Sequence, residues 1–305
     1  MRRLVPLLVC LAVLGWSTPA AESITGTQTA AFILVTFDGS QPWTVAQAQV
    51  TVNQLATYYQ TSSSGQYQLT GTVYGYVQMA PTCDLLAIAT AAKAGITADH
   101  YLYALTANTC GWPAGMTAGQ DSWLNNTILP QTVEHEFGHQ LGLGHAHGPN
   151  GEYGDPWTVM GYGTTTLTGY ERAQLGWLVP TPASYGTWTI LPLDGTGQRV
   201  LTYADLILDY RPENFGVTIR QISGGATTVI PAGGTGCTCY YPLNLGQSWQ
   251  AADGTWFTVT ARNSVSATVV IGSSPATTTT STTTTTTSTT LPPTTTTTRC
   301  RKKHC

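Results

Sequence analysis

The chain has 305 residues, of which 42% are hydrophobic and only 9% are charged, so it can bury a sizeable core in one large domain or two modest ones. Half of the twelve basic residues lie at the two ends, which leaves residues 22–298 with six basic residues against all 15 acidic ones. Such an acidic body argues against nucleic-acid binding, because that function needs a cationic face.

Residues 1–21 have the pattern of a secretory signal peptide, in which Arg2 and Arg3 precede an apolar run and small residues follow it. The apolar run from Leu4 to Trp16 is shorter than the about 20 residues that span a bilayer. No later segment is long and apolar enough to serve as a transmembrane segment. We therefore expect an exported protein that is secreted, extracellular or associated with the cell surface.

Six cysteines remain when the signal peptide is removed, an even number that suits an oxidising compartment. Cys83 and Cys110 flank one segment of the first half, and we predict a disulfide between them. The sequence leaves open how the other four cysteines pair; these are Cys237, Cys239, Cys300 and Cys305.

The first half of the chain alternates predicted strands with predicted helices. Apolar or alternating runs predict strands over residues 30–39, 67–79 and 101–107. Apolar residues at helical spacing predict helices over residues 43–60 and 83–96. This order of elements predicts an α/β layer whose twisted sheet is mostly parallel.

The second half has a different sequence pattern, because helical periodicity disappears after residue 182. Residues 183–272 contain short alternating strands separated by Gly, Pro and Asp, which predict a small antiparallel β-sandwich. Residues 273–299 are almost entirely Thr, Ser and Pro and are expected to be a disordered linker. Residues 300–305 form a basic tip bracketed by two cysteines. The predicted fold class is therefore α+β.

The segment HEFGHQLGLGH, residues 135–145, has the spacing of a metal site. His135 and His139 are four residues apart, which places both imidazoles on one face of a helix that Pro130 is suited to begin. Two neutral imidazoles so placed can bind one Zn²⁺ ion at about 2.0–2.1 Å each. Glu136 projects beside the pair, where it can act as the general base that takes a proton from the zinc-bound water.

A third histidine completes the predicted site. Gly142 is the kind of residue that adopts positive φ and ends a helix, so the chain can turn and bring His145 back as a third ligand. Three histidines and one water make an open catalytic site, whereas structural zinc sites are closed by four protein ligands. We expect one catalytic zinc ion; the sequence leaves calcium open and contains no pattern that indicates it.

The same segment resembles the metzincin zinc-protease signature HExxHxxGxxH at every defined position. Metzincins also carry a methionine-containing turn beneath the zinc, and Met160 in GDPWTVMGYG matches it. Within the metzincins, the chain resembles the gametolysin-like peptidase M11 family through HEFGHQLGLGHAH, EYGD, MG and LGW. The resemblance spans about residues 30–271. It implies a metzincin-like catalytic domain over residues 22–182, with the active-site helix, followed by the β-sandwich domain.

The resemblance implies a secreted zinc-dependent endopeptidase that hydrolyses peptide bonds of extracellular or cell-wall proteins. Its partner would be a protein or peptide substrate lying along an edge strand of the sheet. Tyr162, two residues after Met160, lies where astacin-like and serralysin-like metzincins place a tyrosine that can bind zinc or stabilise the oxyanion; the alternative for Tyr162 is a packed aromatic. Between the signal peptide and the first predicted strand, no room remains for an inhibitory pro-segment.

A second hypothesis is a catalytically inactive, protease-like surface protein for adhesion or binding. The Thr-rich stalk would then display the β-domain, with association to a cell wall or matrix through the C-terminal tail. All three predicted ligands and Glu136 are intact, which favours the enzyme. His147 is expected to be a solvated turn residue and Asp155, before Pro156, to fix a turn.

Overall fold

The structure, a computed structural model, describes residues 23–106, 110–163, 165–212, 216–233 and 242–275. The predicted signal peptide (1–21), nearly all of the Thr-rich segment (273–299) and the basic tip (300–305) lie outside the described residues, as do the four cysteines whose pairing the sequence leaves open. Among the described residues, no helix combines the length and the apolar character needed to cross a membrane.

A five-stranded sheet forms the first part of the chain, in the order β2-β1-β3-β5-β4. Its strands are β1 (Gly26–Thr36), β2 (Tyr67–Gln78), β3 (His100–Leu105), β4 (Gly115–Ala118) and β5 (Asp121–Asn125). The first four strands in this order run parallel, and β4 pairs antiparallel with β5 at the edge. The prediction of a mostly parallel sheet is therefore confirmed, and the sheet ends in an antiparallel strand.

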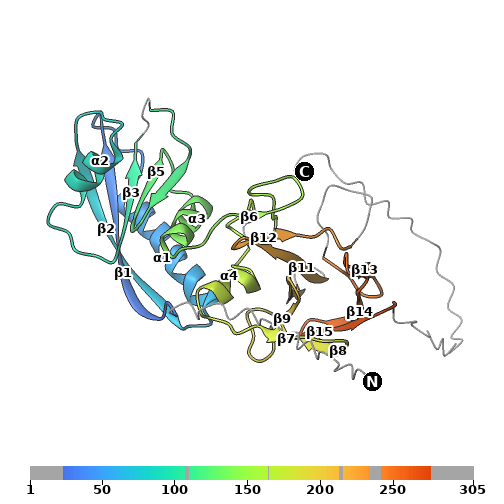
Figure 1. Ribbon diagram of the computed structural model, residues 1–305. Helices are drawn as coiled ribbons and strands as arrows, with labels where there is room; N and C mark the ends of the chain where they lie inside the picture. Colours follow the sequence, from blue (N-terminus) through green and yellow to red (C-terminus); the bar gives the residue numbers. More distant parts are fainter. Residues whose placement is uncertain (1–22, 107–109, 164, 213–215, 234–241, 276–305) are drawn as a thin grey trace, which may run out of the picture.

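Helices cover both faces of this sheet because β1 buries alternate side chains on each face. The helices are α1 (Val45–Ser62), α2 (Leu85–Ala92) and α3 (Pro130–Gln140). Phe32 and Leu34 belong to the core shared with α1 and α3, whereas Ile33 and Val35 belong to the core shared with α2. Figure 1 shows α2 on one side of the sheet and α1 and α3 on the other. This burial on both faces explains why β1 is a continuous apolar run.

The first two helices begin at polar caps. The Thr44 side chain accepts a hydrogen bond from the backbone N of Gln47 at 3.1 Å, and the Gln47 side chain accepts one from the backbone N of Thr44 at 2.8 Å. Asp84 caps α2 by accepting from two backbone N–H groups of its first turn. The helix predicted over residues 83–96 is therefore shorter, because it begins after this cap and ends at Ala92.

The predicted disulfide is present. Cys83 is bonded to Cys110, with the two Cα atoms 5.7 Å apart and a sequence separation of 27. A cross-link that closes a loop of this length stabilises a fold by about 3 kcal/mol, mainly by restricting the unfolded chain. The bond ties the start of α2 to the segment that leads into β4.

The second part of the chain contains a six-stranded sheet, in the order β6-β12-β11-β10-β9-β7, and a four-stranded sheet, in the order β13-β14-β15-β8. The strands of the first are β6 (Ala146–His147), β7 (Thr181–Pro182), β9 (Val200–Tyr203), β10 (Leu206–Arg211), β11 (Gly216–Ser223) and β12 (Ala226–Val229). Those of the second are β8 (Gly186–Ile190), β13 (Ser248–Gln250), β14 (Trp256–Asn263) and β15 (Ser266–Gly272).

The two sheets pack face to face around one core. Leu208 and Ile219 of the six-stranded sheet lie in the same buried cluster as Phe257 and Val269 of the four-stranded sheet. Neighbouring strands are antiparallel except for the outermost pairs of the larger sheet, β6–β12 and β7–β9, which are parallel. The sequence pattern of this half predicted antiparallel strands, and most of its strands do pair antiparallel.

Strand β6 crosses between the two parts of the molecule. It follows α3 after only a short turn, yet it pairs with β12 of the six-stranded sheet (Figure 1). A further short helix, α4 (Gly169–Gln174), lies between β6 and the remaining strands in sequence. The predicted division of the chain at residues 182 and 183 stays a prediction, because β6 joins the second sheet from a position well before that boundary.

Candidate metal centre

Helix α3 carries the first half of the predicted site. It has Pro130 in its first turn and buries Val133 and Phe137 against the sheet. The hydroxyl of Tyr59 on α1 donates to the backbone O of Glu134 at 2.6 Å, which fixes α3 against α1. The opposite side of α3 presents the motif residues away from the core.

The turn after α3 is a Schellman motif. Gly142 has φ +89°, the backbone N of Leu143 donates to the O of Gly138 at 3.0 Å, and the N of Gly142 donates to the O of His139 at 2.9 Å. No heavy atom lies within 4 Å of a Cβ built on Gly142, so its positive φ and not a lack of space calls for glycine. The chain then reverses toward α3, as the sequence predicts.

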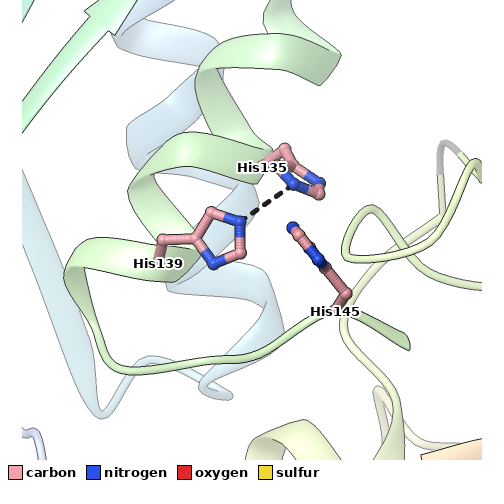
Figure 2. Close-up of side chains that lie close together, drawn as sticks. All are labelled: His135, His139 and His145. Carbon is pink, nitrogen blue, oxygen red and sulfur yellow. Dashed lines mark hydrogen bonds between the residues drawn. The ribbon is translucent and has the colours of Figure 1, made fainter. Parts of the chain in front are cut away.

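This reversal brings three imidazoles together. His135, His139 and His145 each offer one ring nitrogen, and these atoms all lie within 4.8 Å of one another. Figure 2 shows the two histidines of α3 side by side and His145 approaching from the segment after the turn. The Nε2 atoms of His135 and His139 are 3.0 Å apart.

The hydrogen bonds of the rings determine which nitrogens are free to bind a metal. Nδ1 of His135 lies 2.7 Å from the carbonyl O of Val159, and Nδ1 of His139 lies 2.8 Å from that of Leu143. Carbonyl oxygens only accept, so each Nδ1 carries the proton and each neutral ring has its lone pair on Nε2. Two lone pairs that face each other at 3.0 Å repel unless a cation lies near both. The donor set therefore fits a metal ion such as Zn²⁺.

Burial favours the neutral form of the two histidines on α3. It lowers the pKa of His135 to about 4, and the neighbouring rings of His139 and His145 add to this shift while the hydrogen bond to Val159 opposes it. Burial also lowers the pKa of His139 below its ordinary value. Neutral imidazole is the form that binds a metal, so the site is prepared for one near neutral pH.

Glu136 lies at the same cavity and is buried, with 5% of its surface exposed. The Thr117 hydroxyl donates to Oε2 of Glu136 at 2.7 Å. Burial raises the pKa of Glu136 above its ordinary value, while the Thr117 hydrogen bond and the charge of His145 lower it. A glutamate held in this way, with a raised pKa, is suited to take up and release a proton.

Strand β4 forms the opposite wall of the cavity, which has a volume of about 450 Å³. Gly115, Met116 and Thr117 of β4 line it together with the three histidines and Glu136. Because β4 is the last strand of its sheet, its outer edge has no strand partner among the described residues. The cavity thus lies between an open sheet edge and the histidine cluster.

Met160 is fully buried and lies against α3. A Cβ built on Gly138 would be 2.4 Å from its Sδ atom, so the thioether touches the helix backbone next to His139. The carbonyl O of Met160 accepts a hydrogen bond from the backbone N of Ala146 at 2.9 Å. Met160 therefore contacts both the helix with the first two histidines and the segment that carries the third.

The remaining predicted residues lie farther from the cluster. Tyr162 is 57% exposed and is not one of the residues that line the cavity, so its proposed role at the oxyanion stays a prediction. His147 lies half-buried in β6, in register with Thr228, so the expectation of a solvated turn residue is wrong; it is not one of the three converging histidines. Asp155 is fully buried, and its Oδ1 accepts from the backbone N of Trp157, as expected for a residue that fixes a turn.

Two residues of the site were not singled out from the sequence. The ring of Tyr153 lies 3.9 Å from that of His145 and 5.7 Å from that of His135, between centroids, and it lines the cavity. Tyr153 has φ +61°, a conformation that costs energy in a bulky residue and often marks a functional site. Glu152 accepts a hydrogen bond from Nδ1 of His145. Both belong to the EYGD segment of the family resemblance and are close to His145 in sequence, and these are the signals that could have indicated them.

A histidine pair on one helix, a third histidine brought back by a turn and a buried glutamate at the same cavity can together hold a metal ion beside a carboxylate. The model of the gametolysin peptidase M11 family matches residues 35–201, more than half of the chain. The chain therefore belongs to the gametolysin peptidase M11 family.

One solved structure that is similar to this chain is metalloproteinase-II from Bacteroides fragilis. The two are 15% identical, the similarity covers 50% of this chain and 54% of that one, and the TM-score is 0.35. The chain thus corresponds to about half the length of that protein. No curated protein matches the sequence.

Proposed function

We propose that this protein is a secreted, zinc-dependent endopeptidase of the metzincin type that cleaves extracellular or cell-wall proteins. One observation carries the proposal: the neutral rings of His135 and His139 each present an unprotonated Nε2 atom, and a ring nitrogen of His145 converges on the same point, next to the buried carboxylate of Glu136. Members of the family are extracellular, and the signal peptide predicted over residues 1–21 agrees with export.

His135, His139 and His145 would hold the ion, leaving a position open toward the cavity. A bound zinc ion supplies a Lewis acid that polarises the scissile carbonyl and lowers the pKa of water to about 7. Glu136 accepts a proton from the attacking water and later transfers it to the leaving amine. Thr117 keeps one oxygen of this carboxylate occupied, which leaves Oε1 to carry the proton.

The open edge of β4 suits an extended peptide. Its backbone groups could pair with a substrate strand, and such main-chain hydrogen bonds bind peptides largely independently of their side chains. Gly115 and Thr117 lie on this strand beside Glu136. A peptide on this edge would pass the histidine cluster with a backbone carbonyl near Glu136.

Two tyrosines are candidates for the donor that stabilises the negative charge formed on the substrate carbonyl. The resemblance to other metzincins indicates Tyr162. Tyr153 is the one of the two that lines the cavity. A phenol hydroxyl suits this role because it can donate to a developing oxyanion.

The competing hypothesis is an inactive, protease-like surface protein, attached to a wall or matrix through residues beyond 272. The intact histidine cluster and the buried Glu136 give it no support. Metal analysis of the purified protein, combined with cleavage of casein in the presence and absence of a chelator, separates the two hypotheses. If the purified protein contained no zinc and did not cleave casein, the enzyme hypothesis would be wrong.

The role of Glu136 is tested by Glu136→Ala. This variant removes the base without removing a metal ligand, so we expect stoichiometric zinc and loss of casein hydrolysis. Full activity in the zinc-loaded variant would contradict the mechanism. Thr82→Ala, at a residue that does not line the cavity, is the control and should retain both zinc and activity.

A further inference from the structure

The segment that carries His145 is held by the second sheet. Directly after His145, the two residues of β6 pair in parallel with Thr227 and Thr228 of β12. Only the Schellman turn connects His145 to α3 on the other side. The position of the third histidine therefore depends on contacts outside the sheet and helices that carry the other two.

Asp155 links this segment to the methionine turn. Its backbone N donates to the carbonyl O of Ala146 at 3.3 Å, next to His145, and its carbonyl O accepts from the N of Tyr162 at 3.1 Å. A Cβ built on Gly161 would lie 2.0 Å from the same carbonyl O, so the two segments are in close contact. A shift of Asp155 would move both the strand after His145 and the chain after Met160.

The side chain of Asp155 is fixed by an arginine of the β-sandwich. Nε of Arg220, on β11, donates to Oδ2 of Asp155 at 2.7 Å, and Nη1 of Arg220 donates to Oδ2 of Asp209 at 2.7 Å. All three side chains are at most 1% exposed. A buried charge that loses its partner is strongly destabilised, so this arrangement has little freedom to rearrange.

We propose that Arg220 is a positioning residue for the metal site: through Asp155 and β6 it sets the place of His145, so that the β-sandwich completes the site. This inference rests on the proposed metal-binding function. It assigns to the second part of the chain a role in metal affinity, in addition to any role in stability.

Arg211 provides a matched control. It lies on the neighbouring strand β10, is 1% exposed and donates to the carbonyl oxygens of Thr166 and Leu167 at 2.7 Å. Neither of these hydrogen bonds reaches Asp155 or β6. Arg211→Lys should therefore destabilise the same sheet without moving His145.

The test measures zinc affinity of the full chain by competition with a chromophoric chelator, together with thermal unfolding of the metal-free protein. Asp155→Asn and Arg220→Lys are each made in the wild type and in a His145→Ala background. We expect each to weaken zinc binding about 10- to 100-fold in the wild type, as outer ligand-supporting residues do. In the His145→Ala background the same changes should have less than about a twofold effect, because the residue they position is gone.

A spectroscopic readout complements the affinity. With Co²⁺ in place of zinc, the visible absorption of Asp155→Asn should move toward that of His145→Ala, whereas Arg211→Lys should keep the wild-type spectrum and affinity despite a lower Tm. If Arg220→Lys does not fold, Asp155→Asn decides the question, since it preserves the shape of the buried side chain.

The outcomes distinguish a failure of the proposed function from a failure of the positioning role of Arg220. Absence of stoichiometric zinc in the wild type would overturn the proposed function. A wild type that binds zinc, with unchanged affinity in Asp155→Asn, would overturn the positioning role alone. Equal weakening in the His145→Ala background, or in Arg211→Lys at the same loss of Tm, would also overturn it, because either result means general destabilisation.

Discussion

Gly115 and Glu136 are in such close contact that a Cβ on Gly115 would lie 2.3 Å from Oε1 and 2.6 Å from Cδ of the glutamate. Gly115 is on β4 and Glu136 on α3, so the strand can lie against the carboxylate only because residue 115 lacks a side chain. The φ of Gly115 is not in the positive region, which leaves this contact as the reason for glycine.

Gly115→Ala should therefore impair hydrolysis by displacing the Glu136 carboxylate. Misplacement of a reacting group by about 1 Å can lower the rate about 100-fold, and we expect kcat/KM of the variant to fall by about 10- to 100-fold. Zinc content should stay stoichiometric, because no histidine is moved. Steady-state cleavage of a fluorogenic peptide measures the first quantity and metal analysis the second.

Gly75→Ala is the matched control for that variant. Gly75 also lies within a strand, β2, and a Cβ there would meet no atom within 4 Å. Its activity should equal that of the wild type. If Gly115→Ala were as active as Gly75→Ala, the glutamate would not be held where the structure places it.

The two tyrosines can be distinguished by removing one hydroxyl at a time. Tyr153 lines the cavity and its ring lies against those of His135 and His145, whereas Tyr162 is 57% exposed and does not line the cavity. Loss of an oxyanion donor costs about 10²- to 10³-fold in kcat, so we expect Tyr153→Phe to show this loss with little change in KM. Tyr162→Phe should remain within a few-fold of the wild type; the reverse order would support the role that the resemblance gives to Tyr162.

The metal-free protein should lose stability in acid because of His135. Its pKa falls from 6.5 to about 4 on burial, so below pH 6.5 the unfolded chain binds a proton that the folded chain does not. The stabilisation is complete above about pH 6.5 and is lost as the pH falls toward about 4, by an amount on the order of 3 kcal/mol.

Urea unfolding of chelator-treated protein between pH 4 and pH 8 measures this dependence. In His135→Gln the slope of the unfolding free energy against pH should be shallower over the same range. Zinc should bind less tightly in the same acidic window, because protons compete for the imidazoles. A slope that is the same in wild type and His135→Gln would mean that His135 is not protonated more easily on unfolding.

Much of the site follows from local sequence. The structure shows His135 and His139 one turn apart on a helix, and Gly142 with a positive φ. Both features depend only on residues close by in the sequence. The parallel sheet also follows from the order of apolar runs. These features depend on helix geometry, glycine chemistry and burial, which can be inferred from neighbours in the chain.

The features missed from the sequence depend on contacts between distant segments. Gly115 is one of 32 glycines, and nothing near it in the chain shows that Glu136 lies against it. Arg220 and Asp155 are 65 residues apart, and their pairing arises only when β11 packs beside the segment after β6. Tyr153 is close to His145 in sequence, but its stacking depends on a backbone conformation that propensity does not predict.

The turn after α3 also determines how many residues can separate the second and third histidines. Both backbone groups of Leu143 are engaged, since its N donates to Gly138 and its O accepts from Nδ1 of His139. One additional residue between His139 and Leu143 would break one of these bonds or turn the His139 ring away. The hydrogen bonds of the turn therefore fix the number of residues in this part of the motif. Most surface loops tolerate insertions, but this one does not.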